Sequence, residues 1–310
     1  MKIGIVGAGS VGCARAMAAV IRGSAREIVL VNRTRKTARA VATDIRYGTP
    51  LGRKVDITDG DYEDLQGAGV VLITSGVNEK TGGATDREDP QGRLRLLRNN
   101  ADIYRQIIPK IVQAAPKAIL VVVTDPPDPL ADLAHEIAGH SAVLSTGTYL
   151  DSQRFRVHLG RHFRVDPAHV EAQVIGEHGT SQVFLWSSAR VGGVAVSTLL
   201  LDRGEQLNEL QQTLEREVRY ANISIIEGHA ASQYGIGIVS ARMAEVVLND
   251  ERAVIPIGSF QKNFDVTLSL PSVVGRAGVL EVLVPEMSAD ERTALEKSAA
   301  TIKSAIDRVR

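Results

Sequence analysis

The feature that most constrains the fold is a glycine-rich turn between a strand and a helix at the start of the chain. Residues 2–6 are predicted to form a buried strand. This strand leads into Gly7-Ala-Gly-Ser-Val-Gly12 and then into an alanine-rich helix over about 13–21. A second predicted strand, 27–31, follows the helix. A strand, a Gly-x-Gly-x-x-Gly turn and a helix in this order are typical of a unit that binds a dinucleotide.

Each glycine of the turn has a separate role in this interpretation. Gly7 permits the tight turn, Gly9 lets the backbone approach a pyrophosphate, and Gly12 lets helix and strand pack closely. The N-terminus of the helix supplies backbone amides and a positive dipole for the phosphates. The residues predicted to line this part of the cofactor site are Gly7, Gly9, Ser10, Val11, Gly12, Thr74 and Gly76.

The end of the second strand departs from the usual dinucleotide pattern. An Asp or Glu normally stands there to hold the ribose hydroxyls, whereas this chain has Asn32, then Arg33, Thr34 and Arg35. The loss of a carboxylate removes repulsion against a 2′-phosphate, and the guanidinium groups offer it partners. We therefore expect Asn32, Arg33 and Arg35 to bind the cofactor. The predicted cofactor is NAD or NADP, with NADPH accepted or even preferred. The alternative is that both arginines point to solvent as ordinary surface charges.

Strands and helices alternate over roughly the first 145 residues. The continuously apolar runs 70–74 and 119–123 indicate parallel strands covered on both faces. The predicted strands are 2–6, 27–31, 54–57, 70–74, 119–123 and 143–145. This order predicts an α/β fold with a Rossmann doubly wound parallel sheet. The predicted division is a dinucleotide-binding domain at 1–145 and a catalytic, substrate-binding domain at 146–310.

The second half of the chain is predicted to contain long helices and short strands. One apolar stripe predicts a single long helix, marked by Leu207, Leu210, Leu214, Val218, Ala221 and Ile225. Ser288-Ala-Asp-Glu291 is a capping box that opens the last helix, with Leu295, Ala299, Ile302 and Ile306 on its buried face. Strands are predicted at 253–258, 264–270 and 279–283, with a short turn near Asn263.

The composition limits the classes of partner. The 310 residues contain 36 basic and 36 acidic residues, which gives no reason to expect a nucleic acid or an anionic membrane as partner. The single cysteine, Cys13, cannot form an internal disulfide, which fits a reducing compartment. No apolar run reaches membrane-spanning length, and no signal peptide is recognised at the N-terminus. We therefore expect a cytoplasmic protein, with no metal site.

Two segments carry residues suited to moving a proton beside a carboxylate. They are Ser145–Arg156, which contains Asp151 and Arg154, and Ile175–Ser181, which contains His178. Asp151 and Arg154 are three residues apart, so they share one face of a helix. A carboxylate can fix the tautomer of an imidazole, and a guanidinium is a planar clamp for a carboxylate. Each residue alone could be an ordinary surface residue; their joint occurrence favours a site.

With these motifs in place, the chain resembles the L-lactate/malate dehydrogenase family from end to end, and is closer to the lactate branch. The resemblance implies a Rossmann domain followed by an α+β catalytic domain, in a dimer or a tetramer. It also implies an NAD(P)-dependent L-2-hydroxyacid dehydrogenase that transfers hydride between NAD(P)H and a small 2-oxo monocarboxylic acid, such as pyruvate, or a bulkier one.

The resemblance also assigns roles to individual residues. His178 corresponds to the proton donor and acceptor, and Asp151 to the carboxylate that orients it. Arg154 corresponds to the bidentate clamp for the substrate carboxylate. Arg93 aligns with the arginine that polarises the substrate carbonyl, although Arg95 and Arg98 stand close by in the sequence. The position of Ser232 corresponds to a small hydroxyl lining the substrate pocket.

One substrate-binding position differs from the family. Asp125 stands where the family has an Asn that donates a hydrogen bond near the substrate carbonyl, and an Asp can donate only when it is protonated. An ionised Asp125 would favour imidazolium at His178 but repel the developing alkoxide. We therefore expect Asp125 to lower the activity at high pH unless it keeps a proton there.

The loop Gly76–Gly92 is longer than its counterpart in the lactate branch, where it forms a lid that selects the substrate. Gly82 and Gly83 make it mobile. Glu79 aligns with a position that is Gln for lactate and Arg for malate, and a carboxylate there would repel the second carboxylate of oxaloacetate. We therefore favour monocarboxylates, although Lys80 or Arg87 could restore dicarboxylate binding.

Activation by fructose 1,6-bisphosphate is not expected. Some bacterial relatives bind this sugar phosphate through an Arg and a His; Arg156 matches the first, but Glu171 stands at the second. A carboxylate facing a phosphate is unfavourable.

Three alternatives to the leading hypothesis remain. The nearest is a malate dehydrogenase. A nicotinamide-dependent glycosidase would need metal ligands near the substrate, and the only cysteine is Cys13 under the phosphate turn. A non-enzymatic nucleotide sensor would bind the cofactor without oxidising it; the intact set of Asp151, Arg154 and His178 argues against it.

Overall fold

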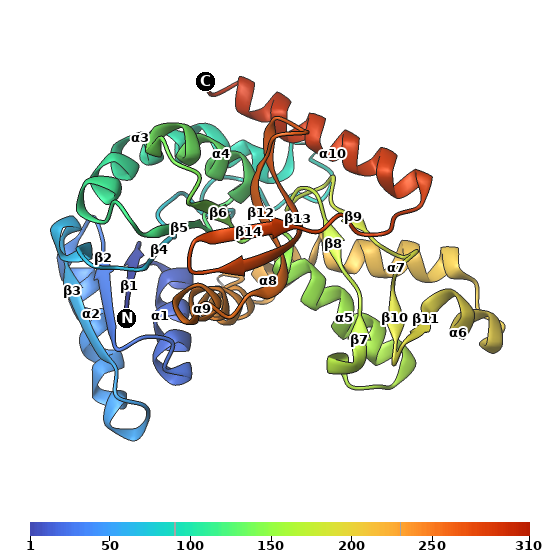
Figure 1. The fold of residues 1–310 in the computed structure, drawn as a ribbon, viewed down its shortest axis with the longest axis horizontal. Coiled ribbons are helices and arrows are strands. Elements are labelled where there is room, and N and C mark those ends of the chain that lie inside the picture. Colours follow the sequence, from blue (N-terminus) through green and yellow to red (C-terminus); the bar gives the residue numbers. More distant parts are fainter. Residues whose placement is uncertain (90, 230) are drawn as a thin grey trace.

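The computed structural model describes residues 1–89, 91–229 and 231–310, and Figure 1 shows its fold. Six parallel strands form the core of one large sheet, in the order β6-β5-β4-β1-β2-β3. They are β1 (Lys2–Val6), β2 (Glu27–Val31), β3 (Asp56–Gly60), β4 (Val70–Ile73), β5 (Ile119–Val122) and β6 (Val143–Ser145). This strand order is that of the doubly wound dinucleotide-binding fold, so the predicted fold class is confirmed.

Helices cover both faces of this sheet, which explains the continuously apolar strands. In β4, Val70 and Leu72 contribute to one hydrophobic core, and Val71 and Ile73 contribute to the other. The helices α1 (Ser10–Arg22), α2 (Arg35–Gly48) and α9 (Tyr234–Asn249) pack on the first face, and α3 (Leu97–Ala114) and α4 (Pro127–Ala138) on the second. Each fully buried aliphatic side chain stabilises such a core by about 1.5–3 kcal/mol.

Three antiparallel strands extend the sheet beyond β6. They are β12 (Ala253–Gln261), β13 (Val266–Gly275) and β14 (Gly278–Val282), and β12 joins β6 where Gly258 pairs with Ser145. The last helix, α10 (Ala289–Asp307), begins at the predicted capping box of Ser288 and Glu291. Its buried face carries the predicted residues, which pack with β13. The hairpin therefore ties the C-terminal part of the chain to the parallel sheet.

A second group of elements lies beside the sheet, at the right of Figure 1. It contains α5 (Tyr149–Phe163), α6 (Val196–Arg203), α7 (Leu207–Arg219) and the short strands β7 (Val170–Glu171), β8 (Val174–Ile175), β9 (Val183–Phe184), β10 (Arg190–Val191) and β11 (Val194–Ala195). Phe155 packs edge-on against Phe184 and Trp186 in the core of this group. Because α5 begins shortly after β6 ends, the packing of this core holds the first turn of α5 near the carboxyl end of β6.

The prediction of one continuous helix over 207–225 is wrong. The helix ends at Arg219, and α8 (Ala221–Gly228) begins after Tyr220, whose backbone leaves the helical conformation (φ −106°, ψ 13°). Leu214 and Val218 are buried in the core that contains Phe155, whereas Ile225 is 41% exposed. The apolar face of one straight helix cannot pack into this core and also reach the surroundings of α8. The break at Tyr220 lets α8 turn, and Asn222 then lines the cavity described below.

The third strand also differs from its predicted range, 54–57. β3 runs from Asp56 to Gly60, because its extent follows the parallel pairing with β2 from Glu27↔Asp56 to Val31↔Gly60. The remaining short helices are η1 (Thr49–Leu51), η2 (Tyr62–Leu65), η3 (Gly92–Leu96) and η4 (Pro167–His169). Among the described residues, no helix is both long enough and apolar enough to cross a membrane.

Candidate active site

A cavity of about 190 Å³ opens at the carboxyl ends of the parallel strands. This edge is where open α/β sheets bind their ligands. It brings together residues from both halves of the chain that the sequence singled out. Its lining includes Gly9, Ser10, Val11, Gly12, Thr74, Gly76, Glu79, Arg93, Asp125, Arg154, His178 and Ser232.

The glycine turn has the geometry that a dinucleotide requires. Gly7 adopts a positive φ of 113°, and its amide donates to the carbonyl of Val31 (2.8 Å). A Cβ on Gly12 would lie 2.0 Å from the carbonyl oxygen of Gly7, so helix and turn can approach only without a side chain. A Cβ on Gly9 would meet nothing within 4 Å. Gly9 therefore faces open space at the helix N-terminus, where the pyrophosphate is expected.

These two glycines make a matched pair of test positions. We expect Gly9→Ala to keep the wild-type melting temperature and to weaken NADH binding by at least about tenfold, since one added methyl blocks the approach of the phosphates. Gly12→Ala should instead destabilise the fold by about 1–3 kcal/mol, because the methyl overlaps backbone. Thermal melting and fluorescence titration with NADH measure both effects. Wild-type NADH affinity in Gly9→Ala would contradict the assigned position of the cofactor.

Asn32, Arg33 and Arg35, the three residues predicted to bind the cofactor ribose, follow the end of β2. None of the three is among the described residues that line the cavity. The side-chain oxygen of Asn32 accepts from the amide of Ala8 (3.1 Å), so Asn32 holds the glycine turn. Arg35 pairs with Asp59 (2.9 Å) and with Asp61, and Arg33 is exposed. Arg33 could therefore bind the 2′-phosphate of NADPH directly, whereas Arg35 would first have to break its ion pairs with Asp59 and Asp61.

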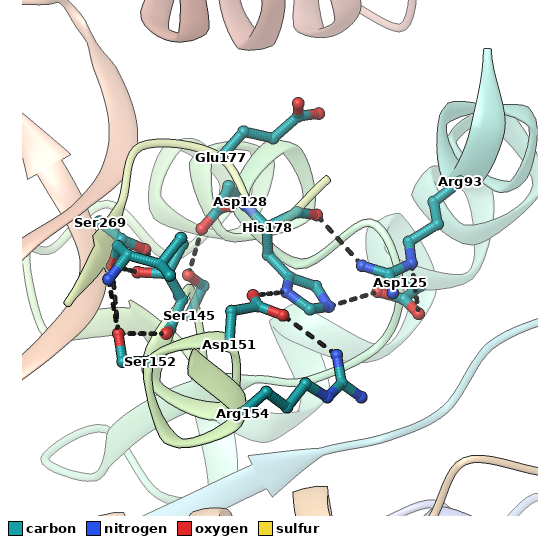
Figure 2. Close-up of polar contacts among 12 residues, drawn as sticks. Arg93, Asp125, Asp128, Ser145, Asp151, Ser152, Arg154, Glu177, His178 and Ser269 are labelled. Carbon is teal, nitrogen blue, oxygen red and sulfur yellow. Dashed lines mark hydrogen bonds and ion pairs between the residues drawn. The ribbon is translucent and has the colours of Figure 1, made fainter. Parts of the chain in front are cut away.

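The imidazole of His178 is braced by a buried carboxylate, as Figure 2 shows. Asp151, in the first turn of α5, is 1% exposed and contacts Nδ1 of His178 through one oxygen. Its other oxygen accepts from Nη1 of Arg154 (3.0 Å). Burial opposes ionisation, but His178, Arg154 and Arg93 outweigh it and lower the pKa of Asp151 to about 2. An ionised Asp151 fixes Nδ1 as a donor and leaves Nε2 of His178 facing the cavity.

A second buried carboxyl, which the sequence reasoning missed, fixes the backbone of His178. Asp128 accepts from the amide of His178 (2.7 Å) and from Oγ of Ser145 (2.5 Å), and it is fully buried. Burial raises the pKa of Asp128 to about 6 despite these hydrogen bonds. The available signal was an acid among apolar residues, Pro-Asp-Pro-Leu, in the first turn of α4. Asp128 is thus a positioning residue, since it acts through His178.

Arg93 is the arginine of its segment that faces the site. It lies in η3, lines the cavity, and donates from Nη1 to the carbonyl oxygen of His178 (3.5 Å). Arg95 pairs instead with Asp89, and Arg98 is exposed. Burial opposes the charge of Arg93, but the surrounding carboxylates, Asp125 first, raise its pKa. A fixed cation therefore stands beside the imidazole.

Asp125 lies between this cation and the proton donor. Its Oδ2 is 3.7 Å from Nε of Arg93, and its Oδ1 is 3.8 Å from Nε2 of His178. The backbone carbonyl of Asp125 accepts from Nδ2 of Asn100 (2.7 Å), and Oδ1 of Asn100 accepts from the amide of Val77 (2.7 Å). Asn100, a buried residue that the sequence reasoning also missed, thus joins Asp125 to the start of the loop over 76–92.

The first residues of the long loop, 76–79, line the cavity, and its later part is bound to α8. Arg87 makes a two-pronged ion pair with Glu227 of α8 and donates to Oγ of Ser224 (3.1 Å). Glu79 lines the cavity, and burial together with Asp125 raises its pKa to about 7. Lys80 is exposed, so neither predicted cation of the loop lines the cavity in this state. Pro90, which belongs to the same loop, lies outside the described residues.

Several further lining residues were missed because they come from distant segments. Asn222 of α8 is 5% exposed and lines the cavity beside Ser232. Leu150 and Ile236 line it from α5 and α9. No local motif marks these positions; they reach the cavity only through the packing of the second half on the sheet.

The two positions compared with a fructose 1,6-bisphosphate site lie away from the cavity lining. Arg156 donates to the carbonyl of Ala172 (3.2 Å), and Glu171 is exposed on β7.

Fold and cavity together are those of a dehydrogenase-type oxidoreductase, since an imidazole braced by a carboxylate and a guanidinium group lie at the mouth of a dinucleotide fold. Comparison with known proteins agrees. Residues 1–143 match the model of the lactate/malate dehydrogenase NAD binding domain, and residues 148–310 match that of the lactate/malate dehydrogenase alpha/beta C-terminal domain. The chain belongs to the lactate/malate dehydrogenase family.

Its relatives cover the whole chain. It is 41% identical over 312 residues to the L-lactate dehydrogenase of Chloroherpeton thalassium, spanning 100% of both chains. It is 42% identical to that of Deinococcus radiodurans, spanning 98% of this chain and 97% of the relative. The crystal structure of a minor L-lactate dehydrogenase from Enterococcus mundtii superposes with a TM-score of 0.92 at 32% identity, covering 100% of this chain and 98% of that one.

Proposed function

We propose that this protein is an L-lactate dehydrogenase-like enzyme that interconverts a small 2-oxo monocarboxylic acid and its L-2-hydroxy acid with a nicotinamide cofactor. The observation that carries the proposal is that Arg154 and His178, both held by the buried Asp151, line the same cavity as the glycine turn. The names of the similar proteins point to the same activity.

The side chains divide the work as follows. The nicotinamide cofactor, when bound, supplies the hydride for C2 of the substrate. Arg154 grips the substrate carboxylate, and Nε2 of His178 gives its proton to the oxygen on C2. Asp151 stabilises the imidazolium before that transfer, and Arg93 places positive charge where the alkoxide develops. In the oxidation direction His178 takes the proton back.

The closest rival activity is that of a malate dehydrogenase. We propose that Glu79 disfavours it, because a carboxyl group on the cavity wall repels the second carboxylate of oxaloacetate when ionised. Initial rates of NADH oxidation with pyruvate and with oxaloacetate test this. We expect kcat/KM to be at least about tenfold higher for pyruvate, equivalent to about 1.4 kcal/mol. A preference for oxaloacetate would move the protein to the malate branch.

For the cofactor, we propose that NADPH is accepted beside NADH. The absence of a carboxylate at Asn32 and the exposed guanidinium of Arg33 support this, whereas Asp59 and Asp61 compete for Arg35. Exposed ion pairs of this kind contribute little to stability, so a phosphate can displace them. Arg33→Ser should raise KM for NADPH several-fold and leave KM for NADH unchanged. Arg26→Ser, at another exposed arginine, is the control.

Asp125 yields a further prediction about pH dependence. Since its carboxyl lies 3.8 Å from Nε2 of His178, its charge holds the imidazolium but opposes the alkoxide. We expect Asp125→Asn to raise kcat for pyruvate reduction several-fold at the maximum of the pH profile, because an amide can donate to the forming alkoxide and an ionised carboxylate cannot. Rate profiles from pH 5 to 9 for both proteins measure this. An unchanged profile and turnover would exclude this role for Asp125.

We also propose that the protein forms a homo-oligomer, a dimer or a tetramer. Met17 and Ile21 on α1 and Ile238 on α9 are exposed by 54%, 67% and 55%, and these two helices pack side by side. Light scattering of the purified protein tests this.

The exposed Glu171 supports the expectation that fructose 1,6-bisphosphate does not activate the enzyme. The division into domains at about residue 145 also remains a proposal.

A further inference from the structure

We propose that the wall formed by Glu79 and Asp125 selects substrates whose side chain carries a protonated amine. This inference rests on the proposed function and names the substrate class for the same site. The substrate would be a 2-oxo or L-2-hydroxy acid with one carboxylate, held by Arg154, and an ammonium group close to C3, received by Glu79 and Asp125.

The first observation is the placement of these two carboxyl groups. Both line the cavity that contains Arg154 and His178, and the side chain of Asp125 is only 19% exposed. Burial and then repulsion from Asp125 raise the pKa of Glu79, so the two carboxyl groups interact within the cavity. Arg93, 3.7 Å from Asp125, can balance only one of these two charges, so the enclosed pair needs a proton or a second cation to neutralise the other.

The second observation is the balance of charge around the substrate. Three carboxyl groups, Glu79, Asp125 and Asp151, face two guanidinium groups and one imidazole. Asp151 already engages both His178 and Arg154. A bound substrate brings a further carboxylate, which uses the remaining donors of Arg154. Among the residues that the structure describes, Arg93 is then the one cation of the cavity wall left beside Glu79 and Asp125.

The third observation concerns what the wall offers to a side chain. The polar lining outside the acid–base trio and Arg93 consists of acceptors or mixed donors and acceptors, among them Glu79, Asp125, Asn222 and Ser232. An ammonium group donates three hydrogen bonds and accepts none, so it suits such a wall. A methyl group leaves these polar atoms without partners, and a carboxylate is repelled.

A proton is the competing way to neutralise the pair. Burial and Asp125 raise the pKa of Glu79 to about 7, so the pair takes up a proton when pH falls below neutrality. The carboxylate that receives the ammonium is therefore present above pH 7 and is lost as pH falls. We accordingly expect the preference for the amino substrate to be largest at alkaline pH and to shrink toward pH 6.

The test runs in the direction of oxidation with NAD⁺ and four L-2-hydroxy acids at pH 8. L-isoserine carries the ammonium, L-glycerate a hydroxyl, L-lactate a methyl group and L-malate a second carboxylate. In each reaction the C2–H bond breaks and its hydride passes to NAD⁺, while the hydroxyl proton passes to Nε2 of His178 as C2=O forms. We expect kcat/KM for L-isoserine to exceed that for L-lactate at least tenfold.

Variants identify the residue that is responsible. Glu79→Gln should cut the ratio of L-isoserine to L-lactate at least tenfold. Glu88→Gln, at an exposed position of the same loop, should keep the wild-type ratio. Melting temperatures verify that both variants are folded.

The outcomes separate the inference from the proposed function. Oxidation of L-lactate with no preference for L-isoserine overturns the inference and leaves the function standing. Equal rates for L-isoserine and L-glycerate show that a neutral donor suffices, which also overturns it. If none of the four acids is oxidised, the proposed function itself fails.

Discussion

Replacing Arg154 with Gln is expected to lower kcat/KM for pyruvate reduction by about a thousandfold, mostly through KM. Arg154 lines the cavity and is fixed by Asp151 at 3.0 Å, so its fork points at the place where a carboxylate must bind. Loss of one partner from a desolvated, hydrogen-bonded charge pair costs about 2–5 kcal/mol. Steady-state kinetics measure the loss, and fluorescence titration should show an unchanged affinity for NADH.

Two further variants keep this prediction specific. Arg154→Lys retains the charge without the planar fork, so it should recover only part of the activity. Arg161→Gln, at an exposed position of the same helix, should behave as wild type. If Arg154→Gln loses kcat with an unchanged KM, then Arg154 does not hold the substrate in the ground state.

Asp151→Asn should reduce kcat by about 10²–10⁴-fold, the range typical for general acid–base catalysis. The carboxylate contacts Nδ1 of His178, and its pKa of about 2 keeps it ionised at every pH at which the enzyme would be assayed. Without that charge, the imidazolium loses its proton more readily, so the alkaline limb of the reduction profile should move to lower pH. A variant with an unshifted profile and wild-type kcat would show that Asp151 is only structural.

The same carboxylate links pH to stability. Because its pKa lies below the ordinary value of 3.8, the contribution of Asp151 is fully present above that pH and is lost as pH falls toward about 2. Thermal melts of wild type and Asp151→Asn should therefore converge in acid.

The sequence was sufficient wherever the signal is local. The glycine turn with its flanking strand and helix, the capping box at Ser288, and the shared helical face of Asp151 and Arg154 each span only a few residues. Spacing of this kind follows from backbone geometry alone. The fold class, a doubly wound parallel sheet, also followed from the alternation of apolar strands and helices.

Features that depend on distant partners were not predictable in the same way. Asp128 matters because it reaches the backbone of His178, 50 residues away in the sequence. Asn100 matters because it joins Asp125 to the loop, and Asn222 because the chain breaks at Tyr220 and turns it inward. The stripe from Leu207 to Ile225 is compatible with one helix or two, since tertiary packing decides where a helix ends.

The most direct test of the central claim is a single turnover with enzyme in excess over NADH. The complex of enzyme and NADH is mixed rapidly with pyruvate, and the loss of NADH absorbance is followed in wild type and in His178→Gln. We predict that wild type consumes the bound NADH and yields L-lactate, whereas the variant binds NADH equally well but reacts at least about a hundredfold more slowly. A wild-type complex that leaves NADH unchanged, or a variant that reacts at the wild-type rate, would contradict the account.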